Sequence, residues 1–195
     1  FLQQYTGSMN TLATAANKLA GGGVDKLLTG RDGQVTDETI KATVDAAQKM
    51  VDAHNSSVKL LNDNADRGAG VVNQLARMVG DPAASAGMAM VGMKMNDDGT
   101  LALDIEKMTA ALKSETPGDT DLFADIIGEV ADSVQKDARA GLNTSAGSLI
   151  GNDVAKMQSI RDNDPIRSFA QSMRGGGAYA FNNQAAVGIL MNLTD

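Results

Sequence analysis

The sequence predicts a mainly α-helical protein: a helical bundle with coiled-coil arms and one small β-hairpin at about residues 88–104. Over two stretches, 2–19 and 40–79, apolar residues recur at alternating spacings of three and four. This is the spacing of a helix that buries one narrow stripe. Hydrophobic residues make up 43% of the 195 residues and aromatic residues only 3%, so Ala, Val, Ile, Leu and Met must build the core. Side chains of this kind suit close helix–helix packing better than a broad ligand pocket.

Residues 1–35 are expected to form an N-terminal coiled-coil arm followed by a loop. Its apolar stripe is predicted to be a seam between subunits and consists of Leu2, Tyr5, Met9, Leu12, Ala16 and Leu19. The glycine triplet at 21–23 should end the first helix, because each glycine costs a helix roughly 1 kcal/mol. The triplet is not a phosphate-binding loop, since it lacks the lysine of that motif and a preceding strand. A short helix at 24–28 and a turn at 29–33 should follow.

Residues 36–160 are expected to form the helical core. A long helix should begin at Thr36 or Asp37, and its buried seam is predicted to contain Ile40, Val44, Val51, His54, Val58 and Leu61. Between 62 and 70, five polar residues and two glycines favour a break over a kinked continuous helix, with a second helix at roughly 70–79. His54 is the only histidine, so packing is expected rather than catalysis. Asp63 and Asp66 are expected in a solvated loop rather than at a cation.

The hairpin is predicted from alternating residues on both sides of Asp97-Asp98-Gly99, with Gly99 supplying a positive φ. A calcium loop is excluded, because its first and last ligand positions would be Lys94 and Ile105. The methionines from Met88 to Met95 are expected to pack in the hairpin rather than to line a peptide groove. Asp104 should cap the next helix, whose apolar face is Ile105, Met108 and Leu112.

The remaining sequence predicts more helices. The next helix should bury one face and end at about 140–141. The residues predicted to face inward are Leu122, Phe123, Ile126, Ile127, Val130 and Val134. A further helix is expected to carry Leu149, Ile150, Val154, Met157 and Ile160. Residues 161–195 are predicted to be a C-terminal helical docking tail.

Charge and composition limit the function classes. The net charge of −7 disfavours binding to nucleic acid or to an anionic membrane surface. The absence of cysteine excludes disulfides, a thiol nucleophile and cysteine-bound metals. Since no apolar run approaches the roughly 20 residues of a membrane helix, membrane insertion is not expected. With one histidine and no G-x-S-x-G motif, the sequence predicts no enzyme and no catalytic, cofactor-binding or metal-binding residues.

Several short motifs follow one another in residues 40–124. The long helix contains Met50-Val51-Asp52-Ala53-His54-Asn55, the hairpin begins near Gly92-Met93, and Asp98-Gly99-Thr100-Leu101-Ala102-Leu103-Asp104 completes it. Met108 to Leu112 and Asp121-Leu122-Phe123 come next. This order resembles the conserved region of the flagellar filament cap (hook-associated protein 2) family, in which a Tyr-Asn pair precedes a "G…DGTL.LD…L..AL…LF" segment. His54 stands where that pattern has Tyr. The outer domains and long terminal arms of cap proteins are absent from this sequence, as expected of a reduced relative or of a fragment of a larger chain.

The resemblance implies a structural subunit that self-assembles through helix seams into an extracellular, axial filament of the flagellar type, cap-like or sheath-like. Its partners would be copies of itself and other flagellar axial subunits, and export would proceed without a cleaved signal peptide. The lack of cysteine and the scarcity of aromatic residues agree with this expectation. The alternative is a secreted binding module, such as an adhesin or an assembly chaperone.

Overall fold

The computed structural model describes residues 1–30, 33–80, 85–116 and 118–150. The docking tail expected at 161–195, and the part of the preceding helix beyond Ile150, lie outside the described residues. Within the described ranges the chain is mainly helical and has a single two-stranded antiparallel hairpin, which confirms the predicted fold class. The expected N-terminal coiled-coil arm instead packs into the helical core.

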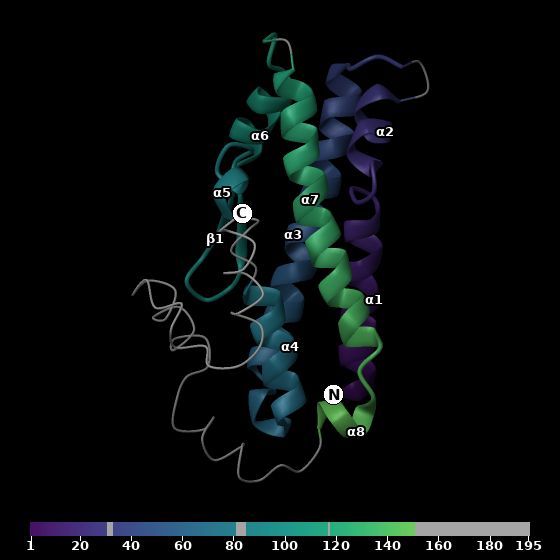
Figure 1. Ribbon diagram of the computed structural model, residues 1–195, viewed down its shortest axis with the longest axis vertical. Helices are drawn as coiled ribbons and strands as arrows, with labels where there is room; N and C mark the ends of the chain where they lie inside the picture. Colours follow the sequence, from purple (N-terminus) through teal and green to yellow (C-terminus); the bar gives the residue numbers. More distant parts are fainter. Residues whose placement is uncertain (31–32, 81–84, 117, 151–195) are drawn as a thin grey trace, which may run out of the picture.

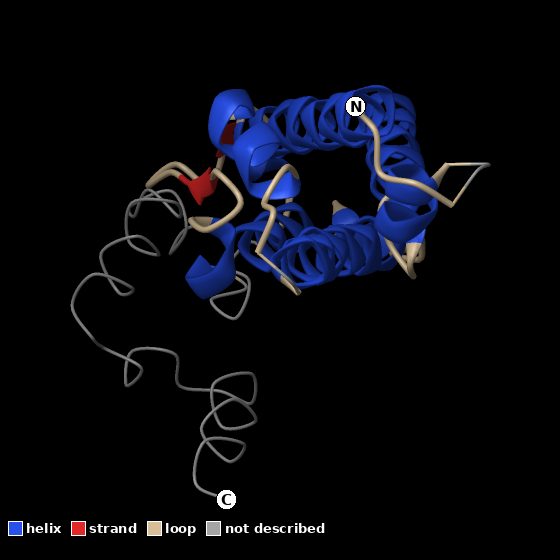
Figure 2. Ribbon diagram, turned by 90° about the horizontal axis from the view of Figure 1, so that it is seen from above, coloured by secondary structure: helices blue, strands red, loops and turns tan. Residues whose placement is uncertain are grey.

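Three long helices form an elongated bundle (Figure 1). They are α1 (Leu2–Asn17), α3 (Asp37–Asn62) and α7 (Asp119–Leu142). α1 runs in the opposite direction to α3 and α7, and the short α2 (Gly23–Thr29) joins α1 to α3 at one end of the bundle. Seen from above, the helices enclose the core from several sides, and the hairpin lies at one edge (Figure 2).

Local sequence explains where the long helices begin and end. Thr36 and Thr39 form a capping box at the start of α3, in which each side chain bonds the backbone N–H of the other residue. Beyond α1, Gly21 and Gly22 adopt positive φ values of 56° and 74°, which glycine tolerates without strain. Asp132 of α7 accepts a hydrogen bond from Gly21 N at 3.0 Å and so ties this turn to the bundle.

The break after the long helix is confirmed. α3 ends at Asn62, a single 3₁₀ turn (η1, Ala65–Arg67) follows, and α4 runs over Ala69–Val79. The heptad stripe continues into α4 in part: Leu75 and Val79, which belong to it, are buried, whereas Val72 is only half-buried and Val71 is buried instead. The start of α4 packs closely against α8 (Ala146–Leu149), since a Cβ at Gly70 would lie 2.2 Å from Ser148 O.

The hairpin is shorter than predicted. Residues 85–88 form the helical turn α5 (Ser85–Met88), and the strands are β1 (Met93–Met95) and β2 (Leu101–Leu103), with Met93 opposite Leu103. Gly92, at φ +74°, turns the chain from α5 into β1, and its carbonyl accepts a hydrogen bond from Asp104 N at 2.8 Å. The alternating residues from 88 to 92 were therefore misread as strand. Asp104 then caps α6 (Ile105–Leu112) through Lys107 N, as predicted.

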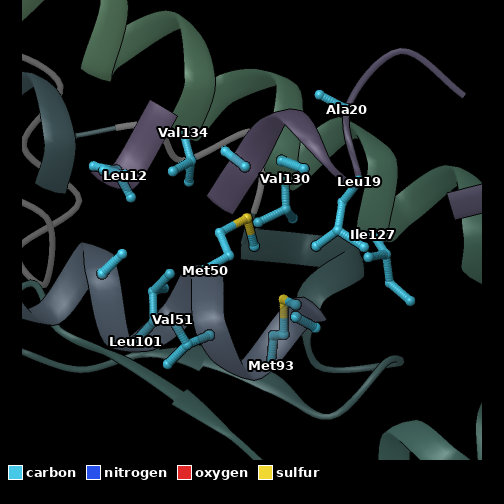
Figure 3. Packing of buried hydrophobic residues seen from close by; sticks show 14 of the residues in the cluster. Leu12, Leu19, Ala20, Met50, Val51, Met93, Leu101, Ile127, Val130 and Val134 are labelled. Atoms are coloured by element: carbon cyan, nitrogen blue, oxygen red, sulfur yellow. The ribbon is translucent and has the colours of Figure 1, made fainter. Parts of the chain in front are cut away.

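The stripe on α1 packs inside the chain, which corrects the expected seam between subunits. Tyr5, Met9, Leu12, Ala16 and Leu19 are each at most 3% exposed, because α1 lies along both α3 and α7. Only Leu2, at 37%, is largely open to solvent. Figure 3 shows Leu12 and Leu19 in the same cluster as Met50 of α3 and Val130 of α7. The described part of the expected arm, up to residue 30, therefore shares one core with the rest of the described chain.

The predicted core seam of α3 is buried throughout. Its residues, none more than 4% exposed, are Ile40, Val44, Val51, His54, Val58 and Leu61. Two apolar residues expected to face inward do not. Ile105 is 50% exposed and Leu122 is 47% exposed. Each lies in the first turn of its helix, α6 or α7, where helical periodicity alone does not ensure a neighbour to pack against.

Candidate functional site at the junction of α3 and the hairpin

His54 projects from the buried face of α3 to the turn of the hairpin. Its Nε2 atom lies 3.0 Å from Gly99 O, and the residue is 2% exposed. A carbonyl oxygen only accepts hydrogen bonds, so Nε2 carries the proton in this contact. Burial lowers the pKa of His54 and outweighs the opposing effect of the hydrogen bond to Gly99. The imidazole is therefore neutral near pH 7 and holds the turn as a hydrogen-bond donor.

Asn55, the next residue, binds the second strand of the hairpin. Its Nδ2 donates to Leu101 O at 2.8 Å, and its Oδ1 accepts from Leu101 N at 2.7 Å. One side-chain amide thus satisfies both backbone groups of a strand residue, as a neighbouring strand would do. This contact also covers part of the edge of β2, where unpaired backbone groups could otherwise bind another chain.

The turn between the strands is stabilised from within. The Asp98 carboxylate accepts from Thr100 N at 2.9 Å and from Thr100 Oγ1 at 2.6 Å, and these bonds lower the pKa of Asp98. Gly99 has a φ of +79°, as the sequence predicted. A Cβ at Gly99 would lie 2.3 Å from Cγ1 of Val79, so α4 closes over the turn. The turn is therefore held between α3 and α4.

The polar side chains at this junction bind the backbone of the hairpin. His54 and Asn55 are both engaged with the hairpin backbone. Among the described residues, no group of three or more His, Asp or Glu residues is placed to hold a metal ion. Asp63, considered as a cation ligand, instead forms an exposed ion pair with Lys59 at 2.8 Å, and Asp66 lies exposed in η1.

The methionines near the hairpin line no continuous groove. Met88 and Met93 are 2% and 1% exposed, and Met95 is half-buried against the core. Met90 alone of this group is largely open, at 48%. The methionine-rich segment therefore serves mainly as packing, as the sequence predicted.

Sequence reasoning missed a second buried polar contact, which lies farther along the bundle. Gln74 of α4 is 3% exposed, and its Nε2 donates to Asp137 O at 2.8 Å. Gly141 makes room for it and for the Tyr5 hydroxyl, which would lie 3.0 and 2.7 Å from a Cβ at that position. Burial raises the pKa of Tyr5, with Arg77 acting in the opposite direction. A polar residue inside the apolar face of α4 was the signal that could have revealed this contact.

The comparisons with known proteins do not place the chain in a family. No family model, no curated protein and no solved structure matches it. A search of the described helices for one long and apolar enough to cross a membrane also found none.

Proposed function

We propose that this chain is a non-enzymatic structural subunit that self-assembles into an extracellular filament of the flagellar type, in a cap-like or sheath-like position. The observation that carries the proposal is the contact of His54 and Asn55 with Gly99 and Leu101. These residues belong to the two motifs on which the resemblance to the filament cap family rests, and they are more than 40 positions apart in the chain. The two short motifs meet in space and form one structural unit, which supports the proposal.

Other residues of the same motifs support this unit. The Gly92 carbonyl binds Asp104 N and closes the base of the hairpin. Met108 and Leu112 of α6 are fully buried, and Phe123 of α7 packs against the same core. The motifs thus describe a helix, a hairpin clasped to it and the helices that follow. In the proposed role this unit acts by binding neighbouring subunits and not by catalysis. Rings and filaments form when such contacts repeat from one subunit to the next.

The test is the assembly state of the purified full chain. Light scattering over a series of concentrations, followed by negative-stain electron microscopy, should show rings, caps or filaments larger than a monomer. Immunogold labelling of flagellated cells of the source bacterium should then place the protein on the flagellum. A strictly monomeric chain at high concentration would contradict self-assembly. Specific binding to other proteins without self-association would favour the secreted binding module instead.

A further inference from the structure

The turn of the hairpin closes over His54. The Nε2 atom of His54 lies 3.0 Å from Gly99 O, and the next residue, Asn55, binds Leu101 with both atoms of its amide. The hairpin itself lies at one edge of the bundle, outside the group of long helices (Figure 2). Movement of the hairpin away from α3 would therefore open His54 to solvent without separating α1, α3 and α7 from one another.

A proton on His54 has no buried counter-charge to stabilise it. The residue is 2% exposed, and burial is the main cause that lowers its pKa, with the Gly99 carbonyl acting in the opposite direction. α1, which packs along the same helix, has no charged residue. The charged residues of α4, of the hairpin and of α3 within four positions of His54 all lie at exposed positions. They are Asp52, Arg77, Lys94, Asp97 and Asp98. A buried charge without a partner is costly, so protonation favours an opening that brings the imidazole into water.

We propose that His54 is a pH-sensitive switch: its protonation releases the hairpin from α3, while α1, α3 and α7 remain packed. This inference goes beyond the proposed function and does not depend on it. The neutral imidazole holds the turn, whereas the charged imidazole is more stable in water than beneath the hairpin. Release of the hairpin is a smaller change than unfolding of the bundle, and it uncovers the ring because Gly99 covers Nε2.

The released hairpin would uncover a surface that is closed at neutral pH. The backbone N–H and C=O of Leu101 lose the amide of Asn55, and unpaired groups on the edge of a strand can bind another extended chain. The side chains of Met93 and Leu101, which are 1% and 3% exposed in the closed form, also become accessible. Acid thus converts a covered strand edge into one that is available for binding.

Burial also defines the pH window of the switch. In the closed form the pKa of His54 lies below its ordinary value of 6.5, whereas in the open form the imidazole is in water and keeps the ordinary value. The open form therefore binds the proton more readily. Below pH 6.5 the ratio of open to closed hairpin should rise by up to about tenfold per pH unit, until the pKa of the closed form is reached. Above pH 6.5 the ratio should stay constant.

Hydrogen exchange of single amides in the full chain, measured by NMR between about pH 7.5 and pH 5, tests the switch. The probe is the Leu101 amide, whose hydrogen bond to Asn55 Oδ1 breaks when the hairpin leaves α3. The reference is the amide of Ile127, a fully buried residue of α7. After correction for the intrinsic effect of pH on exchange, the protection factor of Leu101 should be smaller than that of Ile127 and insensitive to low concentrations of urea. It should fall by up to about tenfold per pH unit below pH 6.5.

Two variants assign the effect to the buried imidazole. His54→Gln keeps a side-chain donor for Gly99 O but does not titrate, so the protection factor of Leu101 should no longer depend on pH. The addition of Lys49→His to this variant returns one histidine to the chain, at an exposed position of α3. The profile of this double variant should remain flat, because an imidazole in water has the same pKa in both forms.

Three results would overturn the inference. If Leu101 and Ile127 share one protection factor and one dependence on urea, the hairpin leaves α3 only when the whole chain unfolds. If Leu101 exchanges through a local opening that does not become more frequent in acid, His54 stays buried in that opening. If the pH dependence persists in His54→Gln, another group causes it.

Discussion

Asn55 is the residue that fixes the hairpin most directly to the bundle. Both hydrogen bonds of its amide end on Leu101, whose side chain is 3% exposed and belongs to the core. Leu101 is therefore held in two ways, by the Asn55 amide at its backbone and by the core around its side chain. Any loss of the amide should loosen the edge of β2 before it affects the remaining helices.

Replacing Asn55 by Ala should lower the free energy of unfolding by about 1–3 kcal/mol, because two backbone groups lose their partners. Urea denaturation followed by circular dichroism measures this change, and hydrogen exchange should show faster exchange of the Leu101 amide. Asn73→Ala, on the exposed side of α4, is the matched control and should change stability little. Equal effects of the two substitutions would show that the contact with Leu101 contributes nothing.

His54 should make stability depend on pH in a defined window. Burial lowers its pKa in the folded state below the ordinary value of 6.5, so the unfolded chain binds the proton more readily. The contribution of the neutral imidazole is therefore complete above pH 6.5. Below that value stability should fall by up to about 1.4 kcal/mol per pH unit, until the pKa of the folded state is reached.

Denaturation curves between pH 7.5 and pH 5 measure this dependence, with pH values chosen to stay above the range of ordinary carboxylates. His54 is the only histidine, so His54→Gln removes the titration while its amide can still donate to Gly99 O. The variant should be less stable near neutral pH but show a flat profile in this window. A wild-type slope that persists in His54→Gln would assign the effect to another group.

At the residue scale the sequence allowed some of the site to be predicted. A lone histidine on an apolar stripe indicates packing, and an Asp-Gly pair between extended runs indicates a turn with positive φ at Gly99. The pairing of Asn55 with Leu101 was not predictable from periodicity. A half-buried amide at the edge of a stripe looks like surface until its partner in a distant segment is placed beside it.

At the scale of elements, helix starts and ends were predictable where caps and glycines mark them. The end of α1 before the glycine triplet and the start of α6 after Asp104 are such cases. The rotation of α4 was predictable in part: Leu75 and Val79 of the stripe are buried, but Val71 is buried in place of Val72. The close approach of α8 to Gly68 and Gly70, at the start of α4, was not predictable, because the partner lies in a distant segment of the chain.

Gly70→Ala tests this close approach. The added methyl group would lie 2.2 Å from Ser148 O and 2.6 Å from Leu149 Cα, both of them backbone atoms that cannot move aside alone. We expect a loss of about 1–3 kcal/mol in the free energy of unfolding, by overpacking. Gly128→Ala, within α7, is the matched control. Its Cβ would have only Leu19 O nearby, at 3.9 Å, so this change should stabilise the protein by about 0.5–1 kcal/mol.

Thermal and urea denaturation of both variants measure the difference. If Gly70→Ala is as stabilising as Gly128→Ala, α8 does not pack against the start of α4 as described. A Gly70→Ser variant should destabilise the protein at least as much as Gly70→Ala, since it adds a larger side chain to the same contact.

At the scale of the whole molecule, periodicity predicts that a stripe is buried but not what covers it. The apolar spacing of α1 is compatible with packing between subunits and with packing inside one chain, because both require the same spacing. The path of the chain after the first helix determines which of these two kinds of packing forms. The turn at Gly21 and Gly22 and the short α2 return the chain into α3, which then lies along α1.

Leu12→Ala distinguishes the two roles of α1. Leu12 is fully buried between the long helices, so its truncation should lower the free energy of unfolding by about 2–5 kcal/mol. Because α1, α3 and α7 share one cluster of buried side chains, probes on all three helices should lose stability together. Leu2→Ala, on the same helix but 37% exposed, is the matched control and should cost about 0.5 kcal/mol or less.

Urea denaturation of the monomer, monitored by circular dichroism and by hydrogen exchange, measures both variants. If α1 were instead a free arm that joins subunits, Leu12→Ala would weaken assembly and leave the unfolding of the monomer unchanged. The substitution therefore separates a helix that packs within the chain from an arm that joins subunits.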